Sequence, residues 1–144
     1  MPLARELRFA RRCYGHLAGA LGVAVTEAMV ARGMLRIASA TAYDLTRAGH
    51  DWLDGFGLDP HQLTPSKAGL ARRCLDGSER RHHLGGPLGV SLLERMMALG
   101  WLERPAPGRA LRLTPVGTQE LANTFGLSLD GPAQDHWPAH EGTQ

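Results

Sequence analysis

Residues 16–35 read HLAGALGVAVTEAMVARGML, and residues 83–102 read HLGGPLGVSLLERMMALGWL, at a constant offset of 67 positions. Eleven of the twenty aligned positions are identical, and no gap is needed to align them. Self-similarity at a fixed spacing indicates structural units that are repeated along a chain. The sequence therefore predicts an internal duplication.

The repeat extends beyond these two stretches. The tetrapeptide ARRC occurs at residues 10–13 and again at 71–74, each time with one of the two cysteines of the chain. We therefore predict a first module over residues 1–60 and a second over residues 61–129. The polar end, residues 130–144, contains Pro and Gly and is expected to be a flexible tail.

The first part of each module has the periodicity of helices. In the first module, apolar side chains recur at spacings of four and three and would form one stripe: Leu3, Leu7, Ala10, Tyr14, Leu17 and Leu21. A short second helix is expected at HLAGALG or HLGGPLG, and a third begins at Val23 or Val90. Gly33 and Gly100 are typical of the residue that ends such a helix.

The second part of each module indicates a β-hairpin followed by a helix. WLER, the turn PAPG and RALRLT form the clearer hairpin, and MLRIASATAYDLT is its weaker counterpart. Thr46 and Thr114 are typical helix N-caps, and Pro115 suits the first helical position. Helix, helix, helix, hairpin, helix is the order of a winged helix. The expected fold is therefore mainly α with two small β-hairpins, arranged as tandem, degenerate winged-helix modules.

Composition excludes several classes of protein. The chain has 144 residues, is 43% hydrophobic and 21% charged, and carries a formal net charge of +2, all typical of a globular protein. No apolar run approaches the ~20 residues that a membrane helix needs, and the chain does not open with a signal peptide. We therefore expect a soluble, cytoplasmic protein without a membrane partner.

Four phrases carry a resemblance to a known family. FARRCYGHLAGALGV, LARRCLDGSERRHHLGGPLGV, ALGWLER and RLTPVG resemble the C-terminal region of ArsR-type transcriptional regulators, in the subgroup with a long extension after the DNA-binding winged helix. The resemblance covers about residues 9–127 and implies the dimerisation and effector-sensing portion of a bacterial regulator. Only MPLAREL precedes it, so we expect the DNA-binding N-terminal domain to be absent. The stripe that starts at Leu3 predicts a homodimer.

The expected recognition helices do not look like DNA readers. Their first turns, VAVTEAM and VSLLERM, present apolar side chains together with Glu27 and Glu94, where base readout needs hydrogen-bond donors. We therefore expect weak, nonspecific DNA binding. The alternative is a complete small winged-helix regulator whose arginines contact the DNA backbone: Arg8, Arg11, Arg12, Arg72, Arg73, Arg80 and Arg81. A solvated helical face, partly paired with acidic residues, explains the same arginines.

The cysteines and two histidines suggest a further possibility. Cys13 and His16 form a C-x-x-H pair, and Cys74 and His83 hold the equivalent positions with six additional residues between them. Thiolate and imidazole ligands suit a soft metal such as zinc. The alternative is that both cysteines pack as small apolar side chains. The sequence favours packing, because no CxxC or HxxxH spacing supports a metal site.

A thiol-dependent enzyme is the remaining alternative. Cys13 would be its nucleophile and His16 its base. A catalytic thiol also needs an electropositive cleft and a third residue that orients the base, and the sequence shows no such trio. We therefore expect a protein that is not an enzyme and that needs no cofactor other than a soft metal.

Overall fold

The chain turns back on itself at Tyr14 and Gly15, where the sequence predicted a continuous helix. Both residues have positive φ, 51° and 92°, as in the tightest β-hairpin turns. The turn joins β1 (Arg11–Cys13) to β2 (His16–Ala18), and α1 (Arg5–Phe9) precedes them. The prediction of one helix along the apolar stripe was therefore wrong.

The structure is a computed structural model that describes residues 3–129, and the expected tail over residues 130–144 lies outside this range. The second ARRC also lies in a strand. It belongs to β5 (Ala71–Leu75), which pairs antiparallel with β6 (His82–Gly85) across a six-residue loop, residues 76–81.

Each half has one long helix where two were predicted. These helices are α2 (Gly19–Ala31) and α4 (Gly86–Ala98). Gly22 and Gly89 bring each helix close to the strand before it, because an added Cβ would lie 2.5 Å and 2.6 Å from a carbonyl oxygen of that strand. No helix within residues 3–129 is long and apolar enough to cross a membrane.

The second part of each half matches the prediction. A hairpin and a helix follow in each case: β3 (Leu35–Ile37), β4 (Ala42–Leu45) and α3 (Arg47–Phe56), then β7 (Leu102–Glu103), β8 (Arg112–Leu113) and α5 (Pro115–Phe125). A 3-10 helix, η1 (Pro60–Gln62), lies between the halves. Thr46 and Thr114 are confirmed as N-caps, since each hydroxyl accepts a hydrogen bond from the backbone three residues on. Gly33 and Gly100 have positive φ after α2 and α4, as predicted.

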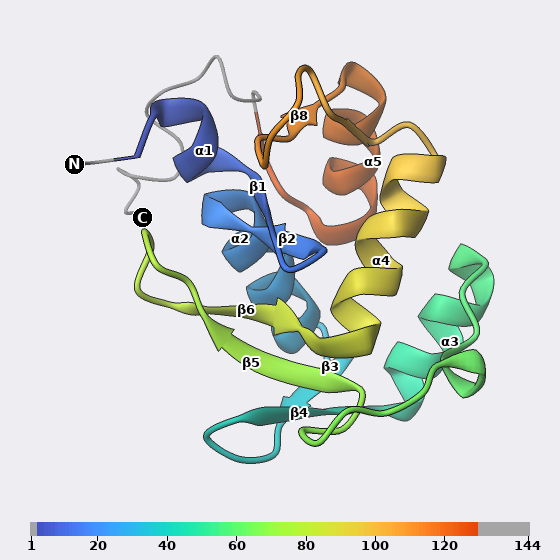
Figure 1. Cartoon of the computed structure of the whole chain (residues 1–144). Helices are drawn as coiled ribbons and strands as arrows, with labels where there is room; N and C mark the ends of the chain where they lie inside the picture. The colour runs from blue at the N-terminus through green and yellow to red at the C-terminus, as the bar shows by residue number, and fades with distance from the viewer. Residues whose placement is uncertain (1–2, 130–144) are drawn as a thin grey trace.

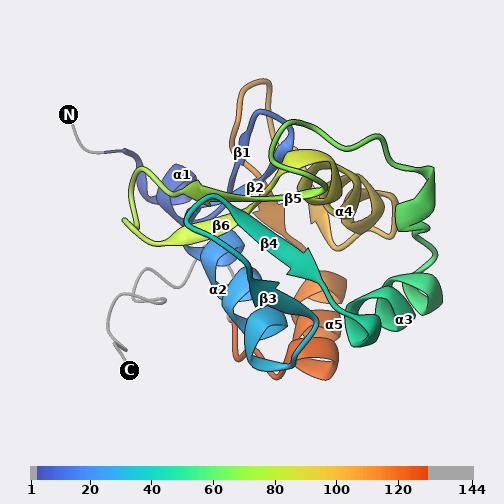
Figure 2. The same cartoon turned by 90° about the horizontal axis from the view of Figure 1, so that it is seen from below.

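The fold class is mixed α/β, which corrects the mainly α prediction. After α1, each half runs strand, strand, helix, strand, strand, helix, so the winged-helix order was wrong. The curled antiparallel sheet β3-β4-β5-β6 contains strands of both halves, because β4 pairs with β5 at Tyr43 and Ala71 (Figure 2). Strands of three to five residues are too short for their period to be distinguished from that of a helix.

The long helices are exchanged between the halves. α2 packs more extensively on β6 of the second half than on β2 of its own, and α4 packs on β2 of the first half (Figure 1). The fully buried side chains of Leu21, Met29, Leu88 and Met96 belong to one continuous core. The two predicted modules therefore share a core, and their division at residues 60 and 61 stays a prediction.

Candidate metal centre

The Cys and His of each half lie opposite each other on a β-hairpin. Cys13 on β1 pairs in register with His16 on β2, and Cys74 on β5 pairs with His83 on β6. The two hairpins meet where β2 lies against β6. The structure thus brings together the four residues that the sequence named as candidate ligands, here called the Cys2His2 cluster.

The cluster has the dimensions of a tetrahedral metal site. The four ligand atoms, two Cys Sγ and two His ring nitrogens, all lie within 4.8 Å of one another. The two His Nε2 atoms are 3.0 Å apart. Tetrahedral zinc with ordinary bond lengths separates two nitrogens by about 3.3 Å and two sulfurs by about 3.8 Å. The observed distance between the nitrogens is therefore close to the zinc value, and the other separations have an upper limit about 1 Å above the sulfur value.

Burial keeps the His16 ring in the form that coordinates metals. His16 and His83 are 3% and 1% exposed. Burial lowers the pKa of His16 to about 4, and the neighbouring His83 and Arg72 act in the same direction. His16 is therefore neutral near pH 7, and a neutral imidazole can donate a ring lone pair to a cation.

The Cys13 thiol is not activated as a nucleophile. Neither Cys13 nor Cys74 forms a disulfide within the described part of the chain. Burial raises the pKa of the Cys13 thiol, and the nearby Cys74 raises it further. A catalytic thiol needs the opposite shift, whereas a coordinated metal ion removes the thiol proton by itself. The chemistry of this pair thus favours metal coordination over catalysis.

A buried carboxylate lies behind the cluster. Asp76, the first residue of the β5–β6 loop, is fully buried, and its Oδ2 lies 3.0 Å from His83 Nδ1. The contact is too bent for a well-directed hydrogen bond, and no other described residue supplies a partner for this nitrogen. Burial alone would raise the pKa of Asp76, but His83, two backbone N–H groups and the Arg11 guanidinium lower it well below its usual range.

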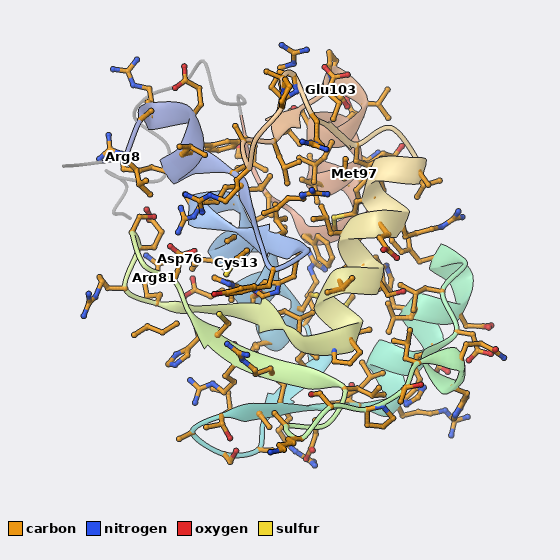
Figure 3. The ribbon with its side chains drawn as sticks, in the orientation of Figure 1. Arg8, Cys13, Asp76, Arg81, Met97 and Glu103 are labelled. Carbon is orange, nitrogen blue, oxygen red and sulfur yellow. The ribbon has the colours of Figure 1, made fainter. Side chains whose placement is uncertain are left out.

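The sequence alone did not indicate this role of Asp76. Its ion pair with Arg11, at 3.1 Å, lies inside the protein and not on the surface. The sequence did contain one signal for this role. The second half has six more residues than the first between its Cys and its His, and Asp76 lies near the start of that longer stretch. In the view of Figure 3, Asp76 lies next to Cys13, whose thiol it influences electrostatically.

Two glycines leave room for the His16 ring. A Cβ at Gly85 would lie 3.0 Å from His16 Cε1 and 3.2 Å from its Nε2, and a Cβ at Gly89 would lie 3.2 Å from the Cβ of His16. Larger residues would displace His16 from the cluster.

The candidate DNA-backbone arginines have different surroundings. Arg11 is 5% exposed, and its guanidinium donates to the buried carboxylate of Asp76. Arg73 donates to the carbonyl of Ser39 and lies against His82, and Arg81 pairs with Glu27. The rest are exposed or half-buried: Arg8, Arg12, Arg72 and Arg80. A role in DNA-backbone binding stays a prediction for the arginines that reach the surface.

The fold and the site together define a small α/β protein with four converging thiol and imidazole groups between two interlocked halves. The helix-turn-helix-type transcriptional regulator YdfF of Bacillus subtilis (strain 168), described as uncharacterized, is 39% identical to the chain over 113 residues. The match covers 78% of this chain and 50% of the regulator, so the chain spans about half the length of that relative. The chain is thus related to a helix-turn-helix-type transcriptional regulator. No family model matches the chain, and no solved structure matches it significantly.

Proposed function

We propose that the chain is the effector-sensing and dimerisation part of an ArsR-like, cytoplasmic transcriptional regulator, and that its Cys2His2 cluster binds a soft metal ion, zinc first of all. The observation that carries the proposal is the convergence of four ligand atoms within 4.8 Å. Each half contributes one thiol and one imidazole, so a bound ion would bridge the halves. Such an ion stabilises the arrangement that binds it and destabilises any arrangement that separates the hairpins.

Weak DNA binding by this part of the regulator also belongs to the proposal. The helices expected to enter a DNA groove, α2 and α4, are instead core helices. Within α2, the Glu27 carboxylate forms an ion pair with Arg81, with 2.8 Å between Oε1 and Nη2. Sequence-specific contacts are therefore expected from a separate winged helix, and binding by this part should fall steeply with salt. Fluorescence anisotropy with promoter DNA measures the affinity of this part, which should be weak at physiological salt.

The predicted homodimer needs a different surface from the one first considered. α1 spans only Arg5–Phe9, and the later members of the apolar stripe, including Leu17 and Leu21, lie in the core. Light scattering on a size-exclusion column, at several protein concentrations, tests the dimer.

Metal content tests the central claim. Protein purified under reducing conditions, stripped with a chelator and reloaded with zinc should retain about one ion per chain after gel filtration. His16→Gln should lose the ion, whereas His61→Gln, an exposed histidine outside the cluster, should keep it. A folded wild-type protein that retains no zinc, cobalt or copper(I) would show that the cluster is not a metal site.

A further inference from the structure

Asp76 gathers an unusual number of buried contacts for a loop residue. Its Oδ1 accepts hydrogen bonds from Arg11 Nη2 at 3.1 Å and, at 3.0 Å each, from the backbone N–H groups of Ser78 and Glu79 and the Ser78 hydroxyl. Its Oδ2 accepts a bond of 2.6 Å from the Gly19 N–H and also faces His83. One carboxylate thus contacts its own loop, the start of α2 and a cluster histidine.

Arg11 continues these contacts toward the N-terminal helix. Its Nη2 binds Asp76, while its Nη1 donates to the carbonyl of Leu7 at 3.0 Å and to Ser78 Oγ at 3.1 Å. Leu7 lies in α1, a helix of five residues that is too short to be stable without such support. The buried residues His83, Asp76 and Arg11 and the half-buried Leu7 thus form a continuous series of contacts from the cluster to α1.

We propose that Asp76 is a positioning residue that orients His83 for the metal ion and, through Arg11, couples occupancy of the cluster to the order of α1. This inference rests on the proposed metal binding. A metal ion bound by both Nε2 atoms requires each ring to carry its proton on Nδ1. For His83 that proton then faces the Asp76 carboxylate, whose remaining contacts hold it in place.

The metal-free state lacks this constraint. The two Nε2 atoms are 3.0 Å apart, so one ring must donate a proton to the other. If His83 is the donor, its Nδ1 bears a lone pair that repels the Asp76 carboxylate. Metal binding removes this tautomer and so strengthens the contact between His83 and Asp76. Because linkage is reciprocal, whatever orders Asp76, Arg11 and α1 also raises the affinity for the metal ion.

The first test measures metal affinity in the full chain. Asp76→Asn is expected to lower the zinc affinity 10–100-fold, the usual effect of losing a carboxylate behind a ligating histidine. Asp44→Asn removes an exposed carboxylate that pairs with Arg36 on the β3–β4 hairpin, and it should leave the affinity unchanged. Competition with a chromophoric zinc chelator gives both values, and circular dichroism shows whether each variant is folded.

The second test follows α1 by hydrogen exchange. In the wild-type protein, zinc should slow exchange of the Arg8 and Ala10 amides severalfold, because both donate hydrogen bonds of the short helix whose Leu7 carbonyl Arg11 binds. The amides of α5 should not respond. In Asp76→Asn saturated with zinc, the response of α1 should be lost while the cluster hairpins remain protected.

A third measurement needs no variant and so covers the case in which Asp76→Asn does not fold. Nitrogen chemical shifts of the zinc-loaded wild-type protein should show that the His83 ring carries its proton on Nδ1 and none on Nε2, the atom that would bind the ion. Protonation at Nε2 overturns the proposal, as does a folded Asp76→Asn with wild-type zinc affinity and wild-type exchange in α1. A wild-type protein that binds no metal instead refutes the proposed function itself.

Discussion

The two hairpins that carry the cluster differ in how they turn. The first closes through two residues, Tyr14 and Gly15, and the Tyr14 side chain is 93% exposed. The second closes through residues 76–81, where backbone N–H groups of the loop bind the buried Asp76 carboxylate. Both nevertheless place a cysteine opposite a histidine on adjacent strands.

This difference separates two requirements of a metal site. A cross-strand pair is enough to place two ligand atoms, because directly opposed residues have Cβ atoms about 4.5–5.5 Å apart. Orienting a ligand ring needs a further group, and only the longer loop supplies one close to its histidine. In the proposed metal site, the first hairpin would therefore contribute ligands alone, and the second would contribute ligands together with the carboxylate that connects them to the rest of the fold.

The largest expected effect tests whether the two hairpins are equivalent as sources of ligands. Cys13→Ser and Cys74→Ser should each weaken zinc binding by more than about 100-fold, since losing a ligand exceeds the loss of a group behind one. The two losses should agree within about tenfold. Chelator competition under reducing conditions measures them. A loss confined to one cysteine would break the equivalence.

The next effect concerns what the longer loop adds to stability. Asp76→Ala leaves the buried Arg11 charge unpaired and should lower the free energy of unfolding by about 3–5 kcal/mol. Tyr14→Ser, in the short turn, should change it by less than about 0.5 kcal/mol. Urea unfolding of metal-free protein compares the two. Similar effects at both turns would show that the loops are not specialised.

A smaller effect is expected beside the histidines. Gly85 stands where the first half has Ala18, and Gly85→Ala should cost about 1–2 kcal/mol because the new methyl group meets the His16 ring. Gly55→Ala is the matched control. Gly55 lies in α3 with no atom near its added Cβ, so the change should stabilise the protein by about 0.5–1 kcal/mol. Thermal unfolding should move in opposite directions for the two variants.

The smallest expected effect compares the exposed Arg81 of the longer loop with its buried Asp76. Arg81 and Glu27 form an ion pair in which both side chains are about half exposed. Arg81→Gln should therefore cost no more than about 1 kcal/mol, and added salt should reduce even that. Urea unfolding at low and high salt checks this. If Arg81→Gln lowered the free energy of unfolding as much as Asp76→Ala, the loop would stabilise the protein through its surface and not through its buried carboxylate.

The sequence predicted some features better than others, for identifiable reasons. Equivalent positions in the repeat identified Cys13, His16, Cys74 and His83 as candidate ligands, although the helical context first assigned to them was wrong. Local signals such as hydroxyl N-caps and terminal glycines were confirmed, because they act within one turn of chain. Asp76 was missed because its burial depends on Arg11 and His83, which reach it only once both hairpins have folded.

The exchange of α2 and α4 between the halves has an evolutionary meaning. A half-length chain would leave the face of its long helix uncovered, and a second copy of the same chain could cover it. Such a pair would place one Cys–His hairpin from each copy on the symmetry axis and would assemble a four-ligand site from two identical genes. If the chain arose by duplication of such a gene, each hairpin became free to diverge once both copies were joined. The loop that carries Asp76 would then be a change that a symmetric ancestor could only have made twice.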